Sequence, residues 1–214
     1  FDAMPALYIA DGHHRSAAAS RVTAARRAAN PRHTGMENYN YFLTVIFPHH
    51  QMQILAYNRV VADLNGMDAA TFLARVRENF SVATSPAPVQ PGPAEFGLYL
   101  PGQWYRLAIH RELIPVNDPT ARLDASLLTD HVLSPVLGIK DLRRDQRIDY
   151  VGGIRGLPEL EKRVNSGEMA AAFALHPTGM EDLMAVAEAG EVMPTKSTWF
   201  EPKLADGLVS HVLD

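Results

Sequence analysis

Residues 11–15 read Asp-Gly-His-His-Arg, which places one acid, one glycine and three consecutive hydrogen-bond donors side by side. They follow a short apolar run and precede an alanine-rich stretch with helical spacing, so we expect a tight loop that enters a helix. The amides of a first helical turn have no intrahelical acceptor, and the helix dipole adds about half a positive charge there. Basic side chains at that end are unfavourable unless an anion compensates them. The pattern therefore predicts a phosphate site.

The side chains of this loop suit separate roles in such a site. Arg15 can bind two phosphate oxygens at once, and Gly12 lets a ligand approach the backbone. His13 and His14 are the predicted catalytic residues, because an imidazole can donate or accept a proton near neutral pH. In the alternative interpretation, Asp11 only caps the helix and the basic side chains are solvated.

Two later stretches also suit phosphate contacts. Residues 149–153 end in two glycines, and Arg143, Arg144 and Arg147 precede them as a basic rim. The alternative there is a simple turn beside a solvated basic face. Residues 196–198 combine an ammonium group with two hydroxyls, next to an aromatic pair that either stacks on a base or belongs to the core. The predicted phosphate- or nucleotide-binding residues are Asp11, Gly12, His13, His14, Arg15, Asp149, Tyr150, Gly152, Gly153, Lys196, Ser197 and Thr198.

The composition of the 214 residues narrows the classes of function. The net charge of −4 makes nucleic acid an unlikely ligand, because such domains are usually basic. The absence of cysteine excludes disulfides, zinc–thiolate sites and cysteine nucleophiles. The histidine pairs at 13–14 and 49–50 lack the spacing of known zinc motifs, so we expect no metal site.

The ends and the hydropathy of the chain indicate its location. No apolar run reaches the length of a membrane span and no signal peptide is apparent, so we expect a cytoplasmic protein without membrane contact. The chain starts at Phe1 and not at Met, and its first predicted strand begins within a few residues. We therefore expect a fragment whose N-terminal part, with any site residues it supplies, is missing.

The elements that must position these residues are interleaved helices and hairpins. They predict an α+β (mixed α/β) fold with a mainly antiparallel or mixed sheet. The predicted helices span residues 13–30, 69–79, 119–132, 157–166 and 180–189, the second of them capped by Asp68. The predicted strands span residues 6–10, 41–47, 53–61, 80–83, 95–100, 103–110, 170–175 and 208–212, with hairpin connections at 48–51 and 101–102.

A proline-rich loop at residues 85–93 is the best candidate linker. It predicts a first part at residues 1–84, which holds the 11–15 loop, and a second α+β part at residues 94–214. The two parts form either separate domains or one continuous domain.

Several motifs resemble those of the bacterial and archaeal family known as domain of unknown function 1015. The motifs, in chain order, are YIADGHHR (8–15), NYF (40–42), ILAYNRVV (54–61), DYVGG (149–153) and MPTKSTWFEPK (193–203). Because members of that family are nearly twice this length, the chain resembles their C-terminal half. The 11–15 loop also resembles the phosphate-holding loop of the ParB/sulfiredoxin superfamily, which includes free-serine kinases.

The superfamily resemblance implies phosphate contacts from residues 12–15, with ATP or ADP and Mg²⁺ as the cofactors to expect. We hypothesise a nucleotide-binding, serine-kinase-like phosphotransferase or a phosphohydrolase that acts on a small molecule. The alternatives are a non-catalytic, nucleotide-responsive or nucleic-acid-binding regulatory module, and a scaffold in which the loop is only structural. The sequence leaves the substrate and the oligomeric state open.

Overall fold

The computed structural model describes residues 1, 3–205 and 207–213, and it divides into two compact units. Unit 1 comprises Phe1–Gln53 together with Phe200–Asp214, and unit 2 comprises Ile54–Trp199. The loop at residues 85–93, where the sequence places a boundary, joins two strands within unit 2.

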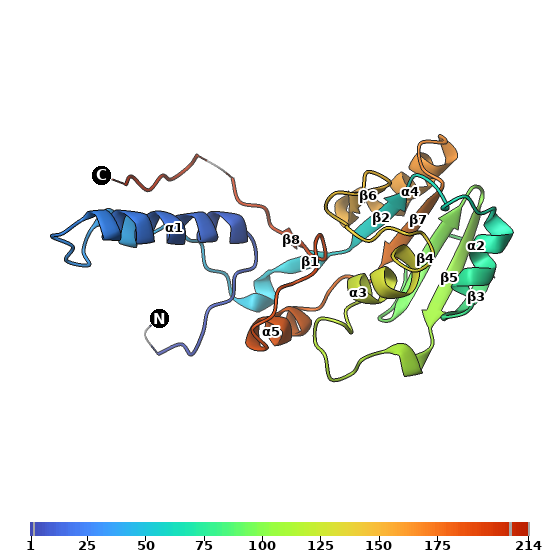
Figure 1. Cartoon of the computed structure of the whole chain (residues 1–214), viewed down its shortest axis with the longest axis horizontal. Helices are drawn as coiled ribbons and strands as arrows, with labels where there is room; N and C mark the ends of the chain where they lie inside the picture. The colour runs from blue at the N-terminus through green and yellow to red at the C-terminus, as the bar shows by residue number, and fades with distance from the viewer. Residues whose placement is uncertain (2, 206, 214) are drawn as a thin grey trace. The chain divides into compact units, whose positions relative to one another are not determined.

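Unit 2 is built on a six-stranded sheet in which neighbouring strands pair antiparallel (Figure 1). The strand order is β3-β5-β4-β7-β2-β6. The strands are β2 (Tyr57–Val61), β3 (Phe80–Ser85), β4 (Glu95–Leu100), β5 (Gln103–Ile109), β6 (Ile148–Gly152) and β7 (Ala171–Leu175). The predicted α+β fold with a mainly antiparallel sheet is confirmed, as is the hairpin of β4 and β5.

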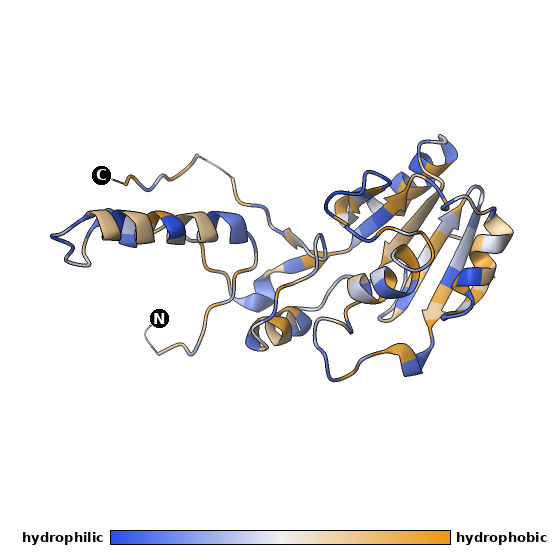
Figure 2. Cartoon of the chain, viewed as in Figure 1, coloured by the Kyte–Doolittle hydropathy of each residue, from blue (hydrophilic) through white to orange (hydrophobic). Residues whose placement is uncertain are grey.

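Strand β7 lies in the interior of the sheet and is buried along its whole length. Its neighbours are β4 on one edge and β2 on the other. Successive side chains of a strand point to opposite faces, so Phe173 joins one apolar cluster and Ala172 joins the other. Because both faces of β7 are buried, its sequence is a continuous apolar run and does not alternate with polar residues. Figure 2 shows apolar residues along the strands of the sheet.

Helices cover both faces of this sheet. The larger cluster contains side chains of α2 (Ala69–Val76) and α3 (Asp124–Leu128), and the smaller one contains side chains of α4 (Gly156–Asn165). The predicted cap of α2 is confirmed, because Asp68 Oδ1 accepts a hydrogen bond of 2.8 Å from the amide of Thr71. The predicted helices at 157–166 and 180–189 are confirmed as α4 and α5 (Met180–Glu188).

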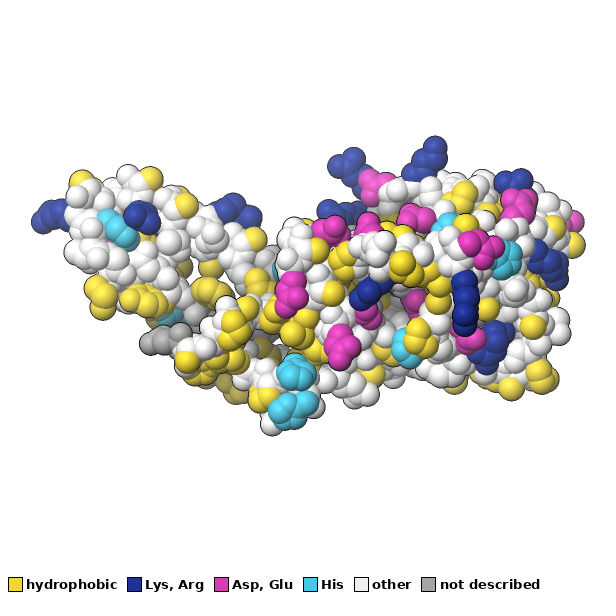
Figure 3. All heavy atoms as spheres, turned by 90° about the horizontal axis from the view of Figure 1, so that it is seen from below, with side chains coloured by type: hydrophobic (Ala, Val, Ile, Leu, Met, Phe, Trp, Pro, Cys, Tyr) yellow, Lys and Arg dark blue, Asp and Glu magenta, His cyan; other side chains and the backbone are white. Residues whose placement is uncertain are grey.

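Unit 1 consists of the long helix α1 (His13–Ala29), two 3₁₀ turns and extended segments. The turns are η1 (Asn38–Asn40) and η2 (His49–Gln51), and α1 has no buried residue. Apolar side chains of the extended segments are exposed, including Leu7, Ile9, Phe42, Leu43 and Val45. Apolar side chains are visible on the surface of this unit in Figure 3.

Three predicted strands are wrong, since residues 6–10, 41–47 and 208–212 contain no strand. An apolar run indicates burial but not a pairing partner, and a strand without a neighbour leaves its backbone groups unpaired. The predicted hairpin at 48–51 is also wrong. Residues 53–61 instead divide into β1 (Gln53–Leu55), which pairs with β8 (Trp199–Glu201), and β2, which pairs with β6 and β7.

The helix predicted from residue 119 begins later, at Asp124. Asp118 accepts hydrogen bonds from the amides of Thr120 and Ala121. This turn keeps the residues just before Asp124 out of the helix. After α3 the chain continues as a π-helical turn, η4 (Thr129–Leu133). Among the described residues, none of the helices combines the length and the apolar character needed to cross a bilayer.

Candidate functional site

The loop at residues 11–15 enters α1 through a left-handed glycine. Gly12 has φ 83° and ψ 20°, and its carbonyl accepts the first helical hydrogen bond, 3.0 Å from the amide of Ser16. A Cβ at this position would lie 3.1 Å from Nη2 of Arg15, so the guanidinium group lies over the glycine. Both the backbone angle and this close approach favour glycine here.

Asp11 does not cap α1. Its Oδ1 accepts a hydrogen bond of 2.7 Å from the amide of Gly12, and its Oδ2 lies 2.9 Å from Nζ of Lys203. Burial tends to raise the pKa of Asp11, but hydrogen bonds from Lys203 and Gly12, with the charges of Lys203 and Arg15, hold it below its ordinary value. The carboxylate therefore fixes an ammonium group beside the start of the helix.

The remaining donors of the loop are exposed. The rings of His13 and His14 lie 4.2 Å apart, and the first turn of α1 contains no acidic residue. Positive groups thus gather at the positive end of the helix dipole, where negative groups are normally preferred. Lys203 also belongs to this group, through its contact with Asp11. It lies in the motif at 193–203, where the residue types predict phosphate contacts only from residues 196–198.

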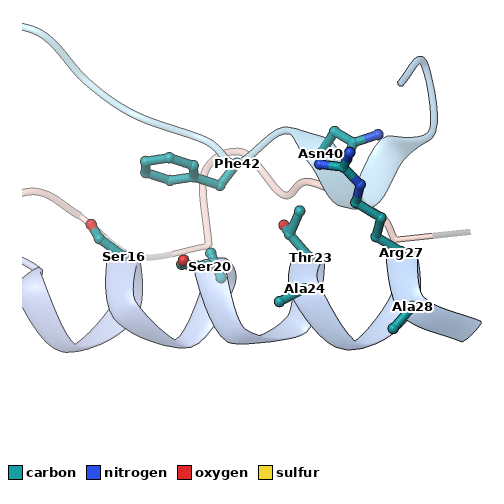
Figure 4. A pocket seen from close by; sticks show the side chains of 9 residues that line it. Ser16, Ser20, Thr23, Ala24, Arg27, Ala28, Asn40 and Phe42 are labelled. Atoms are coloured by element: carbon teal, nitrogen blue, oxygen red, sulfur yellow. The ribbon is translucent and has the colours of Figure 1, made fainter. Parts of the chain in front are cut away.

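A hollow of about 640 Å³ runs along α1 in the same unit. Small side chains of the helix, including Ser16, Ser20 and Thr23, form one side, and Asn40 and Phe42 line the other (Figure 4). Because Ser16 directly follows the 11–15 loop in the helix, the hollow begins beside the predicted phosphate site.

The other predicted residues lie in unit 2, around strand β2. Tyr57 of β2 pairs in register with Gly152 of β6, and its ring centroid lies 5.5 Å from that of Trp199 and 6.0 Å from that of Tyr150. Lys196 Nζ lies 5.7 Å from the centroid of the Tyr57 ring. Residues 149–153 and 196–199 therefore meet at one aromatic cluster.

Several of these residues are engaged with the protein itself. Asp149 Oδ2 lies 2.6 Å from Nη1 of Arg163, and the buried hydroxyl of Ser197 donates a hydrogen bond of 2.8 Å to the carbonyl of Pro194. The amide of Gly153 donates to the carbonyl of Ala56 at 2.7 Å. The phosphate contacts predicted for residues 149–153 and 196–198 stay predictions.

Asp124 has a strongly perturbed pKa, although it belongs neither to the loop at residues 11–15 nor to the aromatic cluster around Tyr57. Burial raises its pKa to about 6, against the opposing effects of a hydrogen bond from the amide of Ala94 and the charge of His176, while Asp182 adds to the increase. Asp124 does not line the hollow along α1. We therefore assign its effect to stability. Among the described residues no group of three potential ligands is arranged to hold a metal ion.

The raised pKa of Asp124 makes stability depend on pH. A carboxyl group that is easier to protonate in the folded state stabilises the protein fully below pH ~4. That contribution is lost as pH rises through about 6. We expect Asp124→Asn to remove a dependence on the order of 1–3 kcal/mol between these values. Urea unfolding of both proteins between pH 4 and 8 measures it. Parallel pH profiles would contradict the assignment.

Gly152 provides the surface on which Trp199 lies. A Cβ at Gly152 would come within 2.5 Å of the indole ring. We expect Gly152→Ala to displace the ring and to lower the free energy of unfolding by about 1–3 kcal/mol, as overpacking usually does. Gly92→Ala is the control, because a Cβ there would find its nearest neighbour at 3.6 Å. Equal effects of the two substitutions would disprove this role of Gly152.

Comparison with known proteins gives a family and a few similar structures. The model of a family described as "Protein of unknown function (DUF1015)" matches residues 1–126. None of the curated proteins matches the chain.

The similar solved structures include two of a free serine kinase in complex with AMP. The first, a mutant, is 17% identical over 89% of this chain and 66% of its own, with a TM-score of 0.47. The second is 15% identical over 73% of this chain and 57% of its own, with a TM-score of 0.43. A conserved hypothetical protein from Pyrococcus furiosus is 14% identical over 89% of this chain and 68% of its own, with a TM-score of 0.43. The chain thus spans less than two thirds of the length of either kinase chain.

Proposed function

This chain belongs to the DUF1015 family, whose function is unknown, and we propose that it binds the phosphate groups of a nucleotide at residues 11–15. The nucleoside would occupy the hollow along α1, where the exposed ring of Phe42 faces Ser16 and Ser20 across the space (Figure 4). An aromatic side chain in that position suits stacking with a base.

The observation that carries this proposal is the concentration of positive groups at the start of α1. Gly12 brings the backbone close to a ligand, Arg15 lies over it, and Lys203 is held nearby by Asp11. Gly12 also has no side chain that could accept hydrogen bonds from the first-turn amides. A phosphate would accept charge-assisted hydrogen bonds from these donors and would reverse the unfavourable interaction with the helix dipole.

The proposed reaction is phosphoryl transfer from ATP or ADP, bound with Mg²⁺, to a small-molecule hydroxyl or to water. The bond between the terminal phosphorus and its bridging oxygen would break, leaving its electron pair on that oxygen of the released ADP or AMP, and a bond from the acceptor oxygen to phosphorus would form. His13 or His14 would take the proton of the acceptor. Arg15 and Lys203 would stabilise the negative charge on the transferred group.

Arg15→Ala tests the binding site. We expect the affinity for ADP and for pyrophosphate to fall about 10- to 100-fold, because hydrogen bonds to charged groups contribute about 1.5–3 kcal/mol. Arg21→Ala is the matched control, since Arg21 is exposed on the same helix away from its start. Isothermal titration calorimetry gives both affinities. Unchanged binding in Arg15→Ala, or no binding by the unmodified chain at millimolar ligand, would refute the proposed site.

His13→Gln and His14→Gln test the reaction separately from binding. We expect ADP affinity to stay within about threefold, because a glutamine amide still donates a hydrogen bond to phosphate. Since the amide cannot accept the proton of the acceptor, we expect the rate of phosphoryl transfer to fall about 10²- to 10⁴-fold in at least one variant. Phosphorus NMR with ATP or ADP follows the rate, with water and L-serine as acceptors. His49→Gln is the control, because His49 belongs to another exposed histidine pair of unit 1. A binding role without catalysis would show as no turnover in the unmodified chain.

A further inference from the structure

Arg59 is a buried cation for which the described residues supply no carboxylate partner. The residue has no exposed surface, and in the described part of the chain its guanidinium group forms no ion pair. The carbonyl of Tyr57 accepts a hydrogen bond from Nη1, the carbonyl of Thr195 lies 3.5 Å from Nη2, and Nε has no hydrogen-bond partner. An unpaired buried charge is unfavourable, so this arrangement calls for a compensating anion.

Burial does not neutralise this side chain. It lowers the pKa of Arg59 to about 10, while Tyr150 and Tyr57 oppose the decrease. The group therefore stays charged at neutral pH. Its position is fixed by the sheet, because Arg59 pairs in register with Tyr150 on one side and Phe173 on the other.

Other arginines of unit 2 have the partners that Arg59 lacks. Arg147 forms ion pairs with Asp145 at 2.8 Å and with Asp63 at 3.6 Å. Arg163 pairs with Asp149 and Glu168. The fold thus supplies carboxylates to these two arginines, whereas the fully buried Arg59 contacts carbonyl groups and the ring of Tyr150, whose centroid lies 5.5 Å from its Cζ.

A basic hollow of about 490 Å³ is lined in part by Thr195, whose carbonyl lies 3.5 Å from Nη2 of the buried Arg59. Lys140, Arg143 and Arg144 line it together with Asp141, so three cations face one carboxylate. Arg143 Nε donates a hydrogen bond of 3.0 Å to Oγ1 of Thr195, another residue of the lining. Among the described residues no carboxylate pairs with the guanidinium group of Arg143.

Thr195 connects the buried cation to the hollow. Its carbonyl approaches Arg59 and its hydroxyl accepts a hydrogen bond from Arg143, so these two guanidinium groups meet at one residue. An anion beside Thr195 would interact directly with Arg143. It would also feel the charge of Arg59 through a medium of low dielectric constant, where electrostatic interactions are strong.

We propose that this hollow, which we name the Thr195 site, binds the phosphoryl group of a small molecule. Phosphoryl groups fit the site for two reasons. They carry up to two negative charges. Asp141 offsets Arg144 at 3.7 Å, so Lys140 and Arg143 supply the direct positive charge, with Arg59 behind Thr195. Phosphoryl oxygens also accept the two parallel hydrogen bonds that an arginine side chain can donate. The volume suits a small ligand, because typical ligand pockets measure about 300–1,000 Å³. The site belongs to unit 2 alone and does not rest on the function proposed for residues 11–15.

Titration calorimetry of the full chain with pyrophosphate tests the Thr195 site. We expect Arg143→Ala to weaken pyrophosphate binding at least tenfold and Thr195→Val to weaken it about two- to tenfold, since the latter removes one hydrogen-bonding group. Arg75→Ala is the control, because Arg75 is an exposed arginine on α2 that pairs with Glu78. Orthophosphate, ADP and adenosine are titrated in parallel. If pyrophosphate, orthophosphate and ADP bind but adenosine does not, the phosphoryl group is the part of the ligand that the site recognises.

A second variant separates a ligand-binding role of Arg59 from a structural one. Replacing a buried charge with an apolar side chain is often neutral or stabilising. We therefore expect Arg59→Met to melt at or above the temperature of the unmodified chain without ligand, and to show a smaller increase in melting temperature with pyrophosphate.

The outcomes distinguish the two proposed sites. If Arg143→Ala and Thr195→Val both bind pyrophosphate with the affinity and stoichiometry of the unmodified chain, the Thr195 site is overturned, regardless of the result for Arg15→Ala. An Arg59→Met chain that is less stable but responds fully to pyrophosphate would overturn the part assigned to Arg59. Weaker binding in Arg143→Ala alone, with Arg15→Ala unaffected, would support the Thr195 site and refute the site at residues 11–15.

Discussion

The burial of β7 on both faces is the constraint on which unit 2 depends. This strand is hydrogen-bonded to β4 and β2, and alternate side chains enter the two apolar clusters. Its register with β2 determines which side chains of β2 face each cluster. A slip of one residue would exchange the two faces of β2 and would move Arg59 away from Tyr150 and the loop at Thr195. The apolar core thus positions the polar residues beside it.

Local signals in the sequence predicted much of this unit. The cap at Asp68, the turn between β4 and β5, and the apolar run of β7 each act over a few residues, and each is present in the structure. The family was also predictable, because the motifs at 8–15, 40–42 and 54–61 lie within residues 1–126, which its model matches. The strands predicted at 6–10 and 41–47 failed for a physical reason. An apolar run cannot reveal whether a neighbouring strand exists.

The candidate sites were only partly predictable, because they depend on contacts between distant residues. Asp11 and Lys203 form their ion pair across 192 positions of sequence. Arg143 and Arg147 looked alike in the sequence, as members of one basic rim. In the structure Arg147 is paired with two carboxylates, whereas Arg143 contacts a threonine hydroxyl. Sequence composition can locate charge, but only the fold decides which charges are already compensated.

The placement of Trp199 against Gly152 has a consequence for optical spectroscopy. The chain has two tryptophans. Trp104 is buried in unit 2, where its indole nitrogen donates a hydrogen bond of 2.6 Å to Glu161. Trp199 is only partly buried, and it lies against Gly152 at the end of the loop that begins at Thr195. The two indoles therefore sample different surroundings, so intrinsic fluorescence contains one signal from the core and another from the loop beside the basic hollow.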